Sequence, residues 1–450
     1  MRYDAVILGF GKAGKTLAGA LAKQGKKVVL VERSRGMYGG TCINVGCIPS
    51  KSLVTSAAEA KLHADAPFEE KAARYAEANA EKRRVTGLLR GKNYDKLNDL
   101  ENVTVMDGFG RFLSGHEVEV LLTDGGSTVL EADRIFINTG SEPVIPRIEG
   151  LEGNPHVYFS ETLMDEEKLP RDLVMIGAGY IGMEFASMYA NFGSNVTVLQ
   201  DGDVFLPRED RDVAEAIHGL LEKQGVKILE NAKTSRLDGG DVIFEKDGVQ
   251  QTLHADAVLV ATGRKAATEG LQLDKAGVAV TPRGAVETDA LLRTTAPDIW
   301  ALGDVNGGPQ FTFVSLDDYR IVMSQLNSGS RSRDDRQNVP YSVFMDTPLG
   351  RVGITEAEAE KKGIPVRILK LPTAAVPKAQ VLRHTGGFLK AVVHAETGKI
   401  LGASLLCPEA YELINTIKLA MDEDLDYTVL RDRIYTHPTM TEAFNDLFAL

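Results

Sequence analysis

The stretch DAVILGFGKAG at residues 4–14 sets the fold of the N-terminal part of the chain. A short apolar run leads directly into a G-x-G-x-x-G pattern, and residues up to Lys23 continue with helical spacing. In this pattern Gly9 makes a tight turn, Gly11 lets the backbone approach a pyrophosphate, and Gly14 lets the helix pack against the strand. The phosphates then face the N-terminus of the helix, so the stretch predicts a strand, turn and helix that bind a dinucleotide.

An acidic residue follows at the distance that such a site requires. A second apolar strand is predicted at residues 27–31, and it ends in Glu32, about 20 residues beyond the glycines. A carboxylate at this strand end can accept hydrogen bonds from both ribose hydroxyls. Glu32 therefore completes the fingerprint of the first dinucleotide site.

The same pattern returns in LVMIGAGYIG at residues 173–182, ahead of a second predicted strand at residues 195–199. That strand ends in Gln200 instead of a clear glutamate, and no arginine stands directly behind it to receive a ribose 2′-phosphate. A chain with two such sites naturally pairs one tightly held flavin with one exchanging nicotinamide. We expect NADH to be favoured over NADPH.

Composition narrows the function classes. The chain has 450 residues, 43% of them hydrophobic, and its 51 Lys and Arg against 63 Asp and Glu give a net charge of −12. No dense basic tract offers a surface for nucleic acid, and no stretch of eighteen apolar residues offers a membrane span. The N-terminus is unlike a signal peptide, so a cytoplasmic protein is expected. The fold class expected is α/β, with about three domains.

Two of the three cysteines lie close together, in GGTCINVGCIPSK at residues 39–51. On a regular helix Cys42 and Cys47 would diverge, so a disulfide between them needs a distorted turn, which Gly46 and the two preceding glycines allow. A thiol near a helix N-terminus is favoured as thiolate. Redox chemistry is therefore preferred over two inert buried cysteines, and no further Cys or His cluster completes a zinc site, so no metal is expected.

Residues 39–51 resemble the active-site signature of the flavoprotein disulfide reductases, the family of glutathione reductase, lipoamide dehydrogenase and mercuric reductase. The motifs ATGR at residues 261–264 and ALGD at residues 301–304 extend the resemblance along the chain. It implies FAD contacts at Gly9, Gly11, Gly14, Glu32, Thr41, Lys51, Gly110, Thr139, Gly140 and Asp304. It implies NAD(P)H contacts at Gly177, Gly179, Tyr180, Gly182, Gln200 and Gly263, with Tyr180 covering the flavin until nicotinamide displaces it.

The resemblance also implies the catalytic groups beside the disulfide of Cys42 and Cys47. His437 and Glu442 match the family's proton-exchanging dyad, in which a carboxylate fixes the imidazole tautomer. Lys51 and Glu184 match an ion pair beside the flavin. Because the dyad of relatives reaches the cysteines of the other subunit, a homodimer with shared active sites is implied.

These anchors predict a split domain order. The FAD-binding domain takes residues 1–145 and 268–335, the NAD(P)H-binding domain takes residues 146–267, and an α+β interface domain takes residues 336–450. Residues 55–100 read as a solvated helical excursion. The polar segment at residues 331–338 reads as a linker.

Four peptides narrow the choice within the family: GFGKAGKT, MYGG, ASLLC and NDLF, at residues 9–16, 37–40, 403–407 and 445–448. Together they resemble the bacterial reactive-chlorine-resistance flavoproteins, which implies reduction of hypothiocyanous acid, a small-molecule oxidant, to thiocyanate. The absence of a cysteine pair after Glu442 argues against mercuric reductase. Reduction of copper or mercury ions, a reductase like lipoamide dehydrogenase or glutathione reductase, and a non-enzymatic flavin redox sensor stay open as alternatives. Cys407 is expected to be a core thiol.

Overall fold

The computed structural model describes residues 1–450 as two compact units. The first unit comprises residues 1–52, 79–145 and 263–336, and the second comprises residues 53–78, 146–262 and 337–450. The α/β class is as predicted. The finer division into three domains stays a prediction, because the segments expected to bind NAD(P)H and to form the interface fall in one unit.

The first unit is built on a mostly parallel sheet. Strands β1 (Arg2–Leu8), β2 (Val28–Glu32), the first half of β3 (Val103–Phe112), the second half of β5 (Ser127–Ile137) and β16 (Ile299–Ala301) run parallel. β4 (Glu117–Leu122) pairs antiparallel with the remaining halves of β3 and β5. A two-stranded ribbon joins β6 (Ser141–Pro143) and β15 (Arg264–Ala266).

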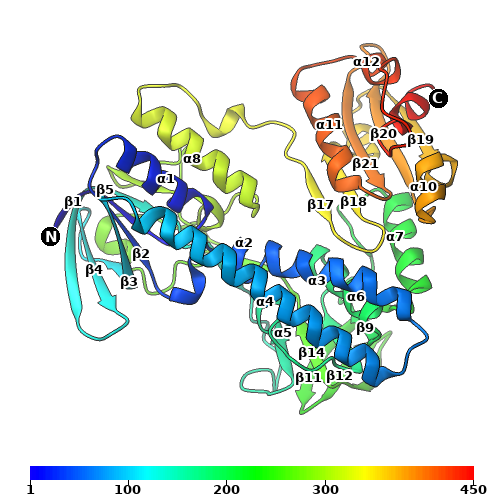
Figure 1. The fold of residues 1–450 in the computed structure, drawn as a ribbon, viewed down its shortest axis with the longest axis horizontal. Helices are drawn as coiled ribbons and strands as arrows, with labels where there is room; N and C mark the ends of the chain where they lie inside the picture. Colours follow the sequence, from blue (N-terminus) through cyan, green and yellow to red (C-terminus); the bar gives the residue numbers. More distant parts are fainter. The chain divides into compact units, whose positions relative to one another are not determined.

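The first glycine loop leads into a helix that packs on this sheet. α1 (Lys12–Lys23) follows the glycine loop after β1. It forms an amphipathic helix, because its apolar face of Leu17, Ala18 and Leu21 is buried against the sheet. α8 (Thr312–Leu326) packs beside α1, as Figure 1 shows. α2 (Thr41–Asn44) carries the first cysteine. The helical excursion predicted at residues 55–100 is helical, with the end of α3 (Cys47–Ala60) and with α4 (Phe68–Asn98), whose residues are divided between the two units. The prediction that it is solvated is wrong for one face, because Tyr75, Asn79 and Lys82 are buried.

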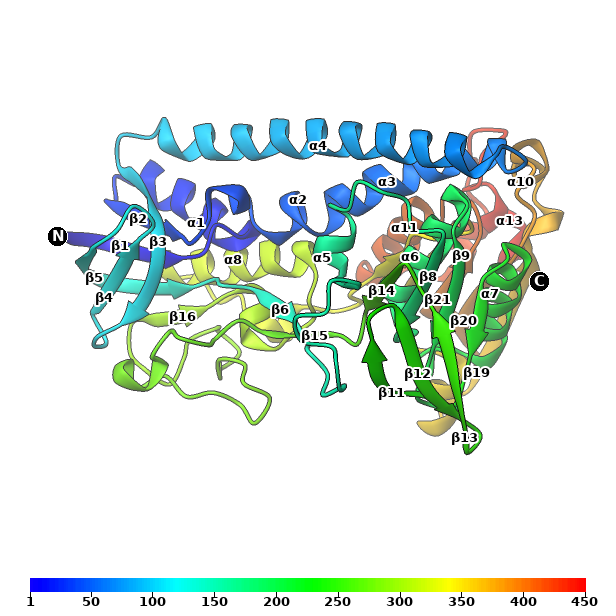
Figure 2. The ribbon, with the colours of Figure 1, turned by 90° about the horizontal axis from the view of Figure 1, so that it is seen from below.

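The second unit contains a parallel sheet in the order β10 (Lys227–Leu229), β9 (Asn195–Leu199), β8 (Asp172–Ile176), β14 (Ala257–Val260) and β7 (Val157–Phe159). Helices α5 (Ser160–Leu163), α6 (Tyr180–Phe192) and α7 (Arg211–Lys223) belong to it. A separate antiparallel sheet consists of β11 (Ala232–Asp238), β12 (Asp241–Lys246) and β13 (Val249–His254). Figure 2 shows these three strands next to one another.

The C-terminal part of the second unit is an antiparallel sheet covered by helices. Its strand order is β17 (Tyr341–Val343), β18 (Leu349–Gly353), β21 (Ile400–Leu406), β20 (Phe388–His394) and β19 (Val366–Pro372). α11 (Ala410–Asp422) packs on β18 and β21. The remaining helices are α9 (Glu356–Lys361), α10 (Pro377–Leu382), α12 (Tyr427–Arg431) and α13 (Ala443–Leu447).

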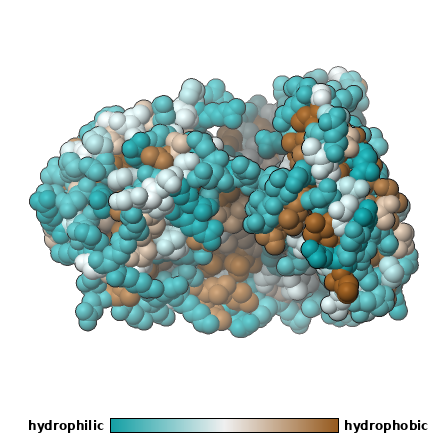
Figure 3. Space-filling view, turned by 90° about the horizontal axis from the view of Figure 1, so that it is seen from above, coloured by the Kyte–Doolittle hydropathy of each residue, from teal (hydrophilic) through white to brown (hydrophobic).

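Hydrophilic residues cover most of the face drawn in Figure 3. None of the helices is both long enough and apolar enough to pass through a membrane.

Candidate functional site

The first glycine loop has the backbone that its sequence predicts. Gly9 follows β1 with φ of +104°, and a Cβ at this position would lie 2.3 Å from the Asn138 carbonyl oxygen. A Cβ on Gly11 would lie 2.5 Å from Asn138 Oδ1, and one on Gly14 would lie 2.6 Å from the Gly9 carbonyl oxygen. A side chain at any of the three positions would collide with Asn138 or with the loop itself, so each position requires glycine. The absence of side chains also leaves the N-terminus of α1 open to a ligand.

Asn138 holds this loop, and the sequence patterns did not reveal it. Its Oδ1 accepts a hydrogen bond from the Gly14 N–H at 2.9 Å, and its Nδ2 donates to the Leu302 carbonyl at 2.6 Å. Asn138 directly precedes the predicted Thr139-Gly140 pair, so its place after the apolar strand β5 was the available signal.

Glu32 lies at the end of β2 and is buried, with 7% of its surface exposed. Its Oε2 accepts the Phe10 N–H at 3.0 Å, and its Oε1 accepts the Ser34 N–H at 3.2 Å. Burial raises the pKa of this carboxyl group, and the two backbone hydrogen bonds oppose that rise. A buried carboxylate at a strand end is the group that a ribose requires.

One cavity brings together four residues predicted to contact FAD: Gly9, Glu32, Gly110 and Thr139. Apolar and polar neighbours complete its wall: Leu8, Val31, Arg33, Gly108, Phe109, Glu142, Ala267, Glu269 and Leu271. A hollow lined by glycine backbone and a strand-end carboxylate fits the adenosine end of a dinucleotide. The first unit therefore fits FAD.

Asp304, Gly140 and Thr41, three further residues predicted to contact FAD, also lie in the first unit, as does Lys51 on α3. Asp304 is in a 3-10 turn after β16 and accepts a hydrogen bond from Ser141 Oγ at 2.7 Å, while burial raises the pKa of its carboxyl group. Gly140 has φ of +77°, and Thr139 Oγ1 donates to the Ala267 carbonyl. Thr41 is the first residue of α2.

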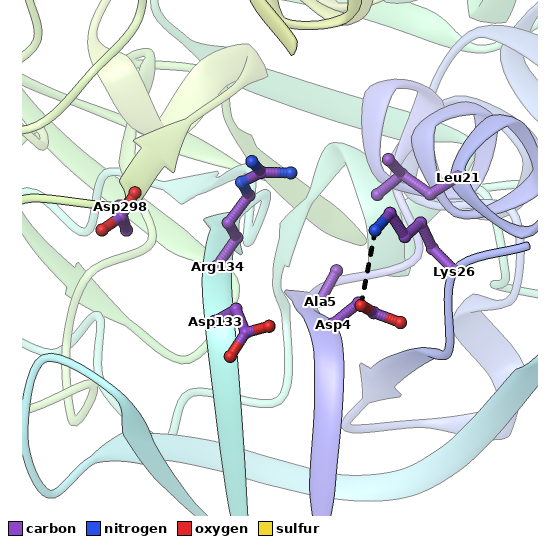
Figure 4. Close-up of a pocket in the computed structure, with 7 residues that line it drawn as sticks. All are labelled: Asp4, Ala5, Leu21, Lys26, Asp133, Arg134 and Asp298. Atoms are coloured by element: carbon purple, nitrogen blue, oxygen red, sulfur yellow. Dashed lines mark ion pairs between the residues drawn. The ribbon is translucent and has the colours of Figure 1, made fainter. Parts of the chain in front are cut away.

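A more polar cavity of about 260 Å³ lies elsewhere in the same unit, lined by Asp4, Ala5, Leu21, Lys26, Asp133, Arg134 and Asp298 (Figure 4). Asp4 and Ala5 are near the amino end of β1, whereas the glycine loop follows its carboxyl end. Ligands of parallel sheets bind at the carboxyl ends of the strands, so this cavity is not the dinucleotide site.

The second glycine loop repeats the first turn in the second unit. Gly177 has φ of +109°, and a Cβ on it would lie 2.7 Å from the Ala261 carbonyl oxygen. A Cβ on Gly182 would lie 2.4 Å from the Gly177 carbonyl oxygen, whereas one on Gly179 would meet nothing within 4 Å. Gln200 donates to the carbonyls of Gly202 and Val204, so its side chain serves its own loop. Gly263 belongs to the first unit.

Two predicted residues on α6 have clear partners. Tyr180, at the first position of the helix, donates from its hydroxyl to Glu209 Oε1 at 2.6 Å, and the Tyr341 hydroxyl donates to the same oxygen at 2.5 Å. Burial and the Glu209 charge raise the pKa of Tyr180. Glu184 is buried and its Oε1 accepts the Phe344 N–H at 2.9 Å. The pairing of Glu184 with Lys51 stays a prediction, because Lys51 lies in the first unit.

The cysteine segment shows the distortion that its spacing requires. α2 ends at Asn44 and α3 begins at Cys47, and a Cβ on the intervening Gly46 would lie 3.0 Å from the Thr41 carbonyl oxygen. Both cysteines are free thiols, so the structure presents the dithiol form, and the disulfide form stays a prediction. Cys47 is exposed and Cys42 is partly buried.

The two thiols share a hydrogen bond. It raises the pKa of Cys42, and burial of Cys42 adds to this rise. Deprotonation of Cys42 is therefore opposed, and Cys47 lies at the N-terminus of α3, a position that favours a thiolate. The hydroxyl of Thr312, at the first position of α8, lies 3.6 Å from Cys47 Sγ and lowers the pKa of Cys42 by hydrogen bonding. The sequence patterns did not point to Thr312; its only signal was a hydroxyl at the start of the helix that follows the Asp304 motif.

The predicted dyad is formed within the second unit. His437 Nδ1 lies 2.8 Å from Glu442 Oε2, and Glu442 Oε1 accepts the Thr439 N–H at 3.1 Å. The hydrogen bond from His437 lowers the pKa of Glu442. The imidazole is 69% exposed, so its second nitrogen is available for proton exchange.

Cys407 takes no part in these arrangements. It is fully buried in the core of the C-terminal sheet, as expected, and burial raises the pKa of its thiol to about 12. The structure holds no cluster of three or more His, Cys, Asp or Glu side chains that could bind a metal ion.

Comparison with known proteins agrees with this geometry. A family model described as pyridine nucleotide-disulphide oxidoreductase matches residues 3–318, and the dimerisation domain of the same family matches residues 339–448. The probable pyridine nucleotide-disulfide oxidoreductase RclA of Escherichia coli K12 is 49% identical over 450 residues, covering 100% of this chain and 99% of the relative. A mercuric reductase of Acidithiobacillus ferrooxidans is 34% identical over 443 residues, covering 97% and 80% of the two chains.

A solved structure extends the likeness to three dimensions. The Cu(II) complex of the HOCl-induced flavoprotein disulfide reductase RclA from Escherichia coli has a TM-score of 0.94 and 48% identity, covering 100% of this chain and 99% of that one. The predicted fold class, enzyme class and cofactors are confirmed by these matches. The chain belongs to the pyridine nucleotide-disulphide oxidoreductase family, and is thus a flavoprotein that uses FAD and NAD(P)H in oxidoreduction at a sulfur group.

Proposed function

We propose that the enzyme reduces hypothiocyanous acid to thiocyanate at the Cys42 and Cys47 pair, as a defence against oxidants. The observation that carries this proposal is the hydrogen-bonded dithiol of Cys42 and Cys47 at the break between α2 and α3, in which neither thiol is fully buried. A small electrophilic oxidant needs an accessible sulfur pair and little else for recognition. The HOCl-induced relative from Escherichia coli supports an oxidant of this class.

FAD, when bound, supplies the chemistry that passes reducing equivalents from NAD(P)H to the cysteine pair. The chain would hold it at Glu32, at the glycines of the first loop and at Asp304. We assign Cys47 to the side of the flavin, together with Lys51 and Glu184, and Cys42 to the side of the oxidant.

The thiols then carry out two substitutions. The Cys42 thiolate attacks the sulfur of hypothiocyanous acid, a sulfur–sulfur bond forms, and hydroxide leaves. His437 gives it a proton, so that water departs, and the Glu442 carboxylate stabilises the charged imidazole. The Cys47 thiolate next attacks Cys42 sulfur and expels thiocyanate, which restores the disulfide.

The assembly proposed is a homodimer in which His437 of one subunit serves the cysteines of the other. The match of residues 339–448 to a dimerisation domain supports it. The three domains stay as proposed, with residues 1–145 and 268–335 for FAD, 146–267 for NAD(P)H and 336–450 for the interface. NADH is the proposed donor, because no arginine stands directly behind Gln200, and the cytoplasm is the proposed location.

Reduction of a thiophilic metal ion is a second candidate. The solved relative was captured with Cu(II), and a mercuric reductase is among the similar proteins. Thiolate pairs bind and reduce such ions readily. In this alternative the metal ion is a substrate.

A side-by-side assay tests both candidates. Purified yellow protein is supplied with NADH or NADPH and with hypothiocyanous acid, cupric ion, mercuric ion, lipoamide or oxidised glutathione. Selective turnover of hypothiocyanous acid is expected. Cys42→Ser should abolish that turnover with FAD retained, whereas the buried control Cys407→Ala should keep it. Full activity of Cys42→Ser would contradict the scheme, and faster reduction of a metal ion or disulfide would replace the proposed substrate.

A further inference from the structure

Lys15 is a partly buried lysine without a carboxylate partner. It lies in the first turn of α1, immediately after the glycine loop. Its ammonium donates to Asn93 Oδ1 at 2.7 Å and to the Gly39 carbonyl at 3.1 Å, and both acceptors are neutral. Lysines that lose hydration normally gain a carboxylate in exchange. The positive charge of Lys15 is therefore not neutralised by an ion pair and acts on the groups around it.

The two acceptors place Lys15 beside the redox segment. Gly39 immediately precedes Gly40, the N-cap of α2, and α2 carries Cys42. Asn93 lies on α4, and a Cβ on Gly39 would lie 3.4 Å from its Cγ. Three elements, α1, α4 and the start of α2, thus meet at the Lys15 ammonium.

The charged groups that face Lys15 are Lys12 on its own helix, Lys96 on α4 and Cys42 on α2. Burial and the two lysines lower the pKa of Lys15 to about 8, while negative charge on Cys42 raises it. The hydrogen bond to Cys47 and the burial of Cys42 raise the pKa of Cys42. The positive charge of Lys15 lowers that pKa and so opposes both effects. Lysine and thiol are therefore electrostatically coupled.

We propose that Lys15 is a positioning residue for the redox pair: it fixes the Gly39 carbonyl at the start of α2, and its unpaired charge stabilises the thiolate of Cys42. This inference rests on the proposed function, in which Cys42 is the attacking thiol. The proposed mechanism needs a Cys42 thiolate, but the hydrogen bond to Cys47 opposes deprotonation of Cys42. The charge of Lys15 favours the thiolate and so counteracts this effect. α2 has only four residues, so its helix dipole offers little compensation.

The test measures the reactivity of each thiol without any oxidant substrate. The holoenzyme is reduced and alkylated with iodoacetamide across a range of pH, and modification of Cys42 and Cys47 is followed separately by tandem mass spectrometry. Lys15→Gln should slow alkylation of Cys42 at pH 7 by about tenfold, the effect of one cation at short range. Lys15→Arg should restore most of the rate. Lys23→Gln removes the same charge from the exposed last turn of α1 and should change nothing.

A further variant leaves Lys15 in place. Asn93→Asp gives the ammonium a carboxylate partner, so it should slow alkylation of Cys42 in the same direction by a smaller factor. This variant decides the matter if Lys15→Gln fails to fold or loses FAD. Unchanged alkylation in both Lys15→Gln and Asn93→Asp would overturn the proposal, as would equal losses in Lys15→Gln and Lys15→Arg. If the wild type does not turn over hypothiocyanous acid, but the variants change the alkylation of Cys42 as expected, the proposed function alone would be overturned.

Discussion

The two glycine loops have the same backbone and different surroundings. In each loop the first glycine has φ near the same value, +104° for Gly9 and +109° for Gly177. Each lies against the carbonyl of the residue that follows the neighbouring parallel strand, Asn138 after β5 and Ala261 after β14. The N–H of Gly9 bonds the Val31 carbonyl, and the N–H of Gly177 bonds the Leu199 carbonyl. Position by position, Glu32 corresponds to Gln200 and Asn138 to Ala261.

Side chains lock only the first loop. Three of its backbone N–H groups are bonded by side chains from other segments: Phe10 by Glu32, Ala13 by Ser315 and Gly14 by Asn138. In the second loop, no side chain bonds the N–H groups of Ala178, Ile181 or Gly182, and Gln200 turns to its own loop. A locked loop suits a cofactor that stays bound, whereas an unlocked loop suits one that must enter and leave in each cycle.

Adding one methyl group to each loop gives the largest contrast. Gly11→Ala places a Cβ 2.5 Å from Asn138 Oδ1, so the Asn138 bond to Gly14 must break, and we expect the purified protein to lose nearly all FAD. Gly179→Ala has open space around its Cβ and an ordinary φ of −77°, so FAD should be retained. Its Cβ narrows the approach of the nicotinamide dinucleotide, and the KM for NADH should rise by about tenfold. The ratio of flavin to protein absorbance and the KM distinguish the two; equal flavin loss in both would contradict the comparison.

Removal of the Asn138 side chain should have the next largest effect. Asn138→Ala deletes the bonds to Gly14 and Leu302 and leaves a buried N–H and a buried carbonyl unpaired, at a cost of about 2–4 kcal/mol. The temperature of flavin release should fall by several degrees. Ala261→Ser, at the matching position of the second loop, should leave that temperature unchanged. An Asn138→Ala protein that releases flavin at the wild-type temperature would show that the lock is not needed.

Acidification should weaken FAD binding at the first loop. Burial raises the pKa of Glu32, so as pH falls this carboxyl group gains a proton before an ordinary glutamate with pKa about 4.3 does. The protonated form accepts ribose hydroxyls less well than the carboxylate does, so FAD affinity should fall by up to about tenfold per pH unit between the raised pKa of the free protein and the lower pKa of the FAD complex. Glu32→Gln should bind FAD more weakly than wild type at neutral pH and show no such dependence. A variant with the wild-type pH profile would exclude Glu32 as the titrating group.

The contrast between the loops also shows which features of the site could be predicted from sequence. The glycines and Glu32 follow from local backbone geometry, which a short motif records. Asn138 and Ser315 could not be found this way, because they are 124 and 302 residues from the N–H groups they bind. The hydrogen bond from Tyr180 to Glu209 could not be predicted either, because no sequence motif near one residue indicates contact with the other.

Residue spacing predicted the break between α2 and α3, because five residues of regular helix cannot bring two sulfurs together. It could not predict the protonation of Cys42, because that depends on its hydrogen bond to Cys47 and its burial, which raise its pKa, and on Thr312 and Lys15 on other helices, which lower it. The two strand–turn–helix motifs and the family resemblance predicted the α/β fold class. The family resemblance, and not residue physics, supplied the roles of Lys51 and Glu184.

The smallest expected effect concerns the choice between the two nicotinamide dinucleotides at Gln200. The amide now donates to the Gly202 and Val204 carbonyls at 3.2 and 2.7 Å, and a carboxylate cannot donate to either. Gln200→Glu should therefore release the side chain from its own loop and recreate at the second strand end the acceptor that Glu32 provides at the first. Such a carboxylate accepts ribose hydroxyls and repels a 2′-phosphate, so the ratio of kcat/KM for NADH to that for NADPH should rise by about threefold to tenfold. Steady-state assays with both donors measure the ratio. An unchanged or smaller ratio would mean that the second loop selects its ligand by groups other than the strand-end residue, and that the two loops differ in more than their side-chain locks.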